Sequence, residues 1–136
     1  MKTFIPPIAL IISLLFLLVS CNKDCESCSC PTPQLEVFGS WTTLQSDAQG
    51  LQYNVELRFN TDYSYDWILL DSVQGHTNSH ADIELDGDIM RIVLDTDCTS
   101  IGIYSLMIKS DKLSIIAKED ACGPRATALE YVWKRK

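Results

Sequence analysis

The chain has 136 residues, a length that fits one domain with a terminal extension and excludes a multidomain enzyme. Its formal net charge of −7 argues against a nucleic-acid partner, because binding to phosphates requires a basic face. The same charge argues against electrostatic adsorption to anionic lipid. Apolar residues make up 46% of the chain, but they are concentrated in residues 1–20, and the remainder has the composition of a soluble globular domain.

Residues 1–20 have the features of a secretory signal peptide. Lys2 supplies a positive charge, and the apolar run 8–19 is shorter than the roughly 20 residues that span a bilayer. The segment 18–21 (Leu-Val-Ser-Cys) resembles the lipobox of bacterial lipoproteins. That resemblance implies that Cys21 is lipidated and becomes the N-terminus, so that acyl chains anchor the protein to the membrane of the cell envelope.

Residues 21–35 contain few large apolar side chains and two prolines, which is typical of a flexible linker. The charged segment 22–24 resembles the export signals of surface lipoproteins in Bacteroidetes-type bacteria. A plain hydrophilic spacer is the alternative. We therefore expect an outer-membrane lipoprotein and leave open whether it faces the periplasm or the cell surface.

Five cysteines remain once Cys21 is lipidated, and the envelope is an oxidising compartment in which disulfides form. Cys98 and Cys122 lie in the domain and are the expected pair. The others lie in the linker: Cys25, Cys28 and Cys30. Their spacing suits metal ligation, but a structural zinc site needs four ligands, so bridges or unpaired thiols are favoured and their state stays open.

From residue 38 onward, apolar and polar residues alternate, which predicts β-strands. The clearest case is the segment 51–59, in which Tyr53, Val55 and Leu57 alternate with polar neighbours. The predicted strands are 38–45, 51–59, 63–71, 80–86, 88–95, 101–109, 112–118 and 127–135.

Eight consecutive antiparallel strands favour an all-β, up-and-down barrel over residues 36–136, because closure removes the exposed sheet edges. Short and long connections alternate along the chain, and alternate connections of a meander lie at the same end. We call the end with the longer loops the mouth and the end with the tight turns the base. Cys98 and Cys122 both fall in mouth loops, where a bridge is feasible.

The motif Gly39-Ser40-Trp41 on the first strand resembles the lipocalin signature. In lipocalins the tryptophan closes the barrel base and a basic residue from the last strand stacks on it. The resemblance implies that Arg135 is this basic residue, with Lys134 as the alternate.

The overall pattern is similar to that of the short lipocalin-like lipoproteins of Bacteroidetes. It covers about 38–136 and includes two further segments, Cys98 to Tyr104 and Cys122 to Arg125. The resemblance implies binding of a small apolar or amphipathic ligand inside the barrel. The inward aromatic residues are the candidate ligand contacts, with a purely structural role in the core as the alternative: Tyr53, Tyr65, Trp67, Tyr104 and Tyr131.

A second hypothesis is a filled barrel that acts as a protein–protein interaction module: an inhibitor, an adhesin or an assembly accessory. We expect no enzyme and no cofactor, because no nucleophile–base motif or phosphate loop occurs. His76 and His80, with Asp71 and Asp82, could capture a metal, but solvated side chains are favoured and no metal site is predicted.

Overall fold

The structure, a computed structural model, describes residues 36–136. The predicted signal peptide (1–20), the lipidation of Cys21 and the linker with Cys25, Cys28 and Cys30 lie outside the described residues. Within residues 36–136, no helix has the length and apolar character needed to cross a membrane.

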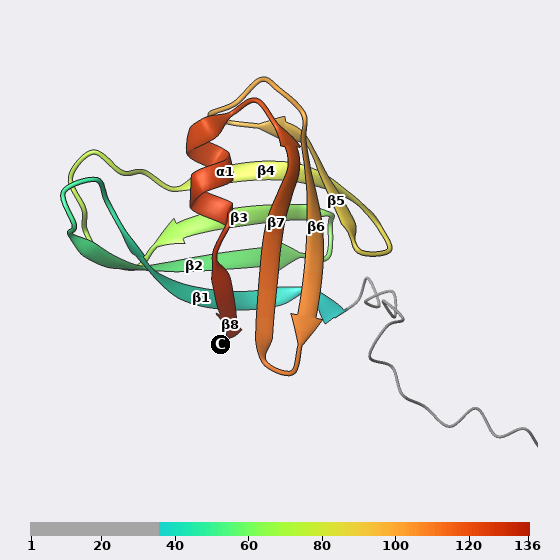
Figure 1. Cartoon of the computed structure of the whole chain (residues 1–136), viewed down its shortest axis with the longest axis horizontal. Coiled ribbons are helices and arrows are strands. Elements are labelled where there is room, and N and C mark those ends of the chain that lie inside the picture. The colour runs from blue at the N-terminus through green and yellow to red at the C-terminus, as the bar shows by residue number, and fades with distance from the viewer. Residues whose placement is uncertain (1–35) are drawn as a thin grey trace, which may run out of the picture. The chain divides into compact units, whose positions relative to one another are not determined.

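Eight antiparallel strands form a closed barrel in which each strand pairs with its neighbours in the chain and β1 pairs with β8 (Figure 1). The predicted up-and-down barrel is therefore confirmed. The strands are β1 (Gly39–Ser46), β2 (Gln52–Asn60), β3 (Ser64–Leu69), β4 (Ser79–Asp86), β5 (Ile89–Asp95), β6 (Gly102–Lys109), β7 (Lys112–Asp120) and β8 (Val132–Arg135). The first seven start and end within two residues of the predicted positions.

The predicted strand 127–135 is wrong in its first half. A short helix, α1 (Gly123–Leu129), precedes a β8 of only four residues. Pro124 lies in the first turn, where its fixed φ suits a helix and its missing N–H costs no hydrogen bond. The buried residues of α1 are Arg125 and Leu129, four positions apart and therefore on one helix face. A helix of two turns is too short for its period to stand out in the sequence.

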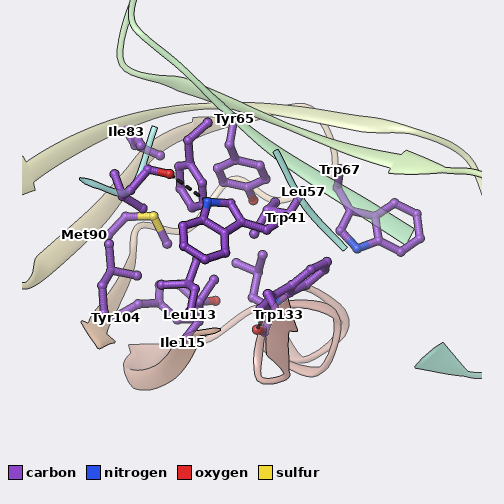
Figure 2. Close-up of a cluster of buried hydrophobic side chains, with 14 of the residues drawn as sticks. Trp41, Leu57, Tyr65, Trp67, Ile83, Met90, Tyr104, Leu113, Ile115 and Trp133 are labelled. Carbon is purple, nitrogen blue, oxygen red and sulfur yellow. Dashed lines mark hydrogen bonds between the residues drawn. The ribbon is translucent and has the colours of Figure 1, made fainter. Parts of the chain in front are cut away.

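The inward-facing side chains pack into one hydrophobic cluster inside the barrel. Trp41, Leu57, Met90 and Trp133 have no exposed surface, and Figure 2 shows Trp41 at the centre of this cluster. The Trp41 indole donates a hydrogen bond to the Val37 carbonyl, at 2.7 Å. The Trp133 indole donates to the Leu129 carbonyl, at 3.1 Å. These two buried polar groups are therefore satisfied by backbone oxygens.

The barrel base is closed by a stacked pair. The Arg135 guanidinium lies 4.1 Å from the centroid of the Trp41 ring, a cation–π contact that contributes about 0.5–2 kcal/mol. Arg135 also donates to the Glu36 carbonyl at 2.5 Å. Gly39 has a φ of 115°, a backbone conformation that side-chain-bearing residues rarely adopt. These are the three residues and the contact that the family resemblance implies for the base.

Glu56 on β2 is a buried carboxylate near the base. It accepts hydrogen bonds from Ser40 at 2.9 Å, Arg58 at 2.7 Å and the Lys136 ammonium at 2.7 Å. The hydrogen bond from Lys136, aided by those from Arg58 and Ser40, outweighs the effect of burial and lowers the pKa of Glu56 to about 2. The charged form of Glu56 therefore stabilises the fold.

Replacing Glu56 by Gln should make the free energy of unfolding less dependent on pH in the acidic range. A carboxyl with a folded-state pKa near 2 contributes stability that is fully present above the pKa of the unfolded chain and is lost as pH falls from about 4.5 towards 2. Because Arg58 and Lys136 are about half exposed, we expect the contribution at pH 7 to be about 1–2 kcal/mol.

Urea unfolding at pH 7 and pH 3 measures the effect. Wild type should lose more stability than Glu56→Gln between the two pH values. Glu84→Gln is the matched control, because Glu84 is 65% exposed and pairs with Arg91 only at 3.7 Å. Parallel losses in wild type and Glu56→Gln would contradict the role of this carboxylate.

Candidate ligand-binding cavity

A cavity of about 810 Å³ opens at the mouth of the barrel. Its walls come from residues of β1 to β5, from the loops at the mouth, and from α1. Its volume lies within the range of roughly 300–1,000 Å³ that is usual for small-molecule sites. The barrel is therefore filled at the base and hollow at the mouth.

Four of the five aromatic residues predicted as ligand contacts line this cavity: Tyr53, Tyr65, Trp67 and Tyr131. Tyr53 points inward from β2, and Tyr65 and Trp67 point inward from β3, two residues apart along the strand. Tyr131 lies between α1 and β8. The alternation of the strands thus brings together side chains that are far apart in the sequence.

Tyr104, the fifth candidate, does not line the cavity. Its side chain has no exposed surface, and its hydroxyl donates a hydrogen bond to Asp120. Burial, with this hydrogen bond and the Asp120 charge, raises the pKa of the phenol. Tyr104 is therefore placed in the core, against the ion cluster described below.

Tyr53 and Tyr65 of the cavity wall present neutral hydroxyl groups. Burial raises the pKa of Tyr53, and the nearby Tyr131 and Asp47 add to the shift. Burial also raises the pKa of Tyr65, with a further contribution from Asp95. A neutral phenol both donates and accepts a hydrogen bond, so these groups can serve as polar anchors beside the aromatic rings of the wall.

Trp67 differs from the other two tryptophans of the chain, Trp41 and Trp133. Its side chain is buried, with 7% exposed, yet its indole Nε1–H has no hydrogen-bond partner within residues 36–136. Figure 2 shows the Trp67 ring set apart from the close-packed rings of Trp41 and Tyr65. A buried donor without an acceptor costs about 1–3 kcal/mol, so this group needs an explanation.

Arg125 of α1 forms a buried ion cluster with Asp95 and Asp120, which the sequence analysis did not predict. The Arg125 guanidinium is 4% exposed and lies between Asp95, at 3.0 Å, and Asp120, at 2.7 Å. All three of its nitrogen atoms donate, to the two carboxylates and to the Ser100 carbonyl. Hydrogen bonding to Asp120 raises the pKa of Arg125. Burial opposes ionisation of Asp120, but hydrogen bonds from Arg125 and Tyr104 outweigh it and lower its pKa.

The cluster needs a glycine beside it. A Cβ at Gly102 on β6 would lie 2.8 Å from Asp120, 2.8 Å from Tyr104 and 2.9 Å from Arg125. Only glycine lets these three side chains meet against the strand. The sequence carried a weak signal for this arrangement, because Arg125 belongs to a segment of the family resemblance, but nothing in the pattern distinguishes a buried arginine from an exposed one.

The predicted disulfide between Cys98 and Cys122 is confirmed. The two Cα atoms are 6.1 Å apart, and both cysteines line the cavity. The bond joins the loop between β5 and β6 to the residue just before α1. It therefore ties the same two regions that the Arg125 cluster joins, on the rim of the mouth.

The two histidines have separate environments. His76 lies in the loop before β4 and lines the cavity, with its ring centroid 5.0 Å from that of Tyr53. His80 lies on β4, with Nδ1 2.7 Å from Asp66 and Nε2 3.7 Å from Asp82. Asp71 instead accepts hydrogen bonds from Asn54. No group of three or more potential metal ligands occurs within residues 36–136.

The charges around the cavity are mainly acidic. Asp47, Asp95 and Asp97 belong to its lining, and within the described residues Arg125 is the one arginine or lysine there, with His76 as the other basic side chain. Because Asp95 and Asp120 both pair with Arg125, the ion cluster carries a net negative charge. The lining of the cavity thus combines four large aromatic side chains with polar and acidic residues.

A scan against protein-family models, a search of curated proteins and a search of solved structures found no match. The cavity and its side chains are therefore the basis for a functional proposal.

Replacing Arg125 by Met should destabilise the domain strongly. The substitution keeps much of the side-chain volume but leaves the buried Asp95 and Asp120 carboxylates without their cation, a change that typically costs about 3–5 kcal/mol. The free energy of unfolding from urea titration measures the loss. Arg91→Met is the control, because Arg91 is half exposed and 3.7 Å from Glu84, so its loss should stay below about 0.5 kcal/mol. Similar small losses in both variants would contradict the structural role of the cluster.

Proposed function

We propose that this protein is a lipid-anchored lipoprotein of the bacterial envelope whose lipocalin-like barrel binds a small apolar or amphipathic ligand. The observation that carries the proposal is the 810 Å³ cavity at the mouth, with four aromatic side chains in its wall. The two hypotheses from the sequence differ on this point, since a ligand binder needs a cavity and the interaction module was expected to be a filled barrel.

The chemistry of the wall suits an amphipathic molecule. The rings of Tyr53, Tyr65, Trp67 and Tyr131 offer apolar surface, whose burial contributes roughly 25 cal/mol per Å². The phenol hydroxyls and the Trp67 indole offer a few fixed polar contacts among these rings.

The cavity is also preorganised. The Cys98–Cys122 disulfide and the buried Arg125 cluster hold α1 on the rim. A rim that is already ordered loses little conformational entropy when a ligand binds, which favours affinity.

The proposed lipid anchor precedes the strand that enters the barrel at its base. Residues 36–38 lead into β1 at the base, beside the turn between β2 and β3, because Gly39 pairs with Phe59. Within the described residues, the chain therefore enters the barrel at its base. In this proposal the membrane is reached through the anchor, and the outer membrane is the expected location. Nucleic acid is not a partner, because the net charge of −7 does not suit binding to phosphates.

We propose binding and not catalysis. The His80–Asp66 pair resembles the base and orienting group of a hydrolase, but the His80 side chain is half exposed on β4. No serine or cysteine side chain is hydrogen-bonded to it within residues 36–136. Within the described part of the chain, no serine or cysteine is therefore placed for activation by His80.

One observation favours the alternative, an interaction module. Three apolar side chains at the mouth are about half exposed: Leu51, Leu70 and Ile101. Exposed apolar residues near one another can mark a protein-binding surface. A partner bound at the mouth would cover the cavity instead of leaving it for a ligand.

Native mass spectrometry of the protein purified from its own cells tests the ligand proposal. We expect an adduct of constant mass on the wild-type protein. Thr127→Trp should abolish it, because Thr127 is an exposed cavity residue of α1 and the larger ring would occupy the cavity. Thr99→Trp is the matched control, since Thr99 is also exposed at the mouth but does not line the cavity. A protein without any adduct, or an adduct that survives Thr127→Trp, would favour the interaction module.

Replacing Cys21 by Ala tests the anchor separately. The variant cannot receive the acyl chains at this position, so it should leave the membrane fraction that holds the wild-type protein. Cell fractionation with immunoblotting measures the distribution. Continued membrane retention of the variant would contradict lipid anchoring at Cys21.

A further inference from the structure

We infer that the ligand presents an uncharged oxygen acceptor, a carbonyl or hydroxyl group, to the Trp67 indole, and that the cavity discriminates against carboxylates. The inference rests on the proposed function and specifies its ligand class.

The first observation is the unpaired donor. Trp67 forms part of the cavity wall, and its buried Nε1–H lacks an acceptor within residues 36–136. The indoles of Trp41 and Trp133 show that this fold supplies backbone acceptors where it buries tryptophan in the core. The exception occurs at Trp67, the tryptophan that belongs to the cavity lining. A ligand oxygen would complete its hydrogen bonding.

The second observation is the charge around the cavity. Asp47, Asp95 and Asp97 belong to the lining, and the ion cluster adds no free positive charge. Every nitrogen of Arg125 already donates to a protein oxygen. A ligand carboxylate would therefore meet these aspartates without a free guanidinium or ammonium group in the described lining, where His76 is the one other basic side chain. This juxtaposition of like charges disfavours binding.

The two observations select a class together. An anion is disfavoured by the aspartates, although it could accept from Trp67. An ammonium group is compatible with the aspartates but has no lone pair to accept a hydrogen bond. A neutral carbonyl or hydroxyl satisfies Trp67 without adding negative charge. Amides, esters and alcohols with an apolar body meet both conditions.

The test compares three probes that share one apolar chain: octanamide, octanoate and octylamine. The full-length protein is held in phospholipid nanodiscs, with empty nanodiscs as the blank. Isothermal titration calorimetry at pH 7.5 should give an affinity for octanamide at least about tenfold above that for octanoate. Trp67→Phe should weaken octanamide binding by about three- to tenfold, as expected for one hydrogen bond, and should leave the affinity for octylamine within about twofold.

NMR of the three tryptophan indole N–H groups gives a readout that a purely structural role would not move. Octanamide should shift the Trp67 resonance downfield and leave those of Trp41 and Trp133 in place, since both already have acceptors. The Trp67→Phe spectrum assigns the resonance.

The outcomes separate the two proposals. Binding of all three probes with equal affinity, tighter binding of octanoate, or an unmoved Trp67 resonance would overturn the inference and leave the ligand-binding proposal intact. If none of the probes binds, both the ligand-binding proposal and the inferred ligand class are overturned for small apolar molecules. Tighter octanamide binding that depends on Trp67 would support both.

Discussion

The Arg125 guanidinium between Asp95 and Asp120 is the interaction on which the mouth of the barrel depends. It joins α1 to β5 and β7 and to the Ser100 carbonyl, so one side chain connects the helix with the strands beside it. Taking these charges out of water is costly, and the arrangement is stable because each guanidinium nitrogen finds an oxygen. Without α1 in this place, the cavity would lose the wall that Thr127, Ala128 and Leu129 provide.

Most of the fold could be predicted because the signals are local. Strict alternation, as in Tyr53, Val55, Leu57 and Phe59, places each strand and its inward face, and the buried residues of β2 include all four. The alternation of short and long connections gives the polarity of the barrel. The prediction of one strand after β7 was wrong because two turns of helix and four residues of strand are both shorter than the window in which a period can be recognised.

The candidate site could be predicted only in part. Inward direction follows from alternation, but height along the barrel axis depends on how neighbouring strands are staggered, which sequence does not give. Tyr104 and Tyr65 therefore looked alike, although one packs on Asp120 and the other reaches the cavity. The unpaired Trp67 indole and the shared burial of Arg125 with two aspartates are properties of the assembled barrel, and no residue pattern expresses them.

The shortness of β8 has a mechanical consequence for the wall. Only Trp41 and Thr42 of β1 pair with β8. Further towards the mouth, side chains replace the backbone ladder: the Thr43 hydroxyl donates to the Val132 carbonyl at 3.1 Å, and the Gln45 amide donates to the Ala128 carbonyl at 2.8 Å. Separating β1 from α1 therefore breaks fewer backbone hydrogen bonds than separating two full strands. Thermal fluctuations should separate β1 from the segment of α1 and β8 first, which enlarges the mouth on that side. The pairing from β1 through β7 stays intact.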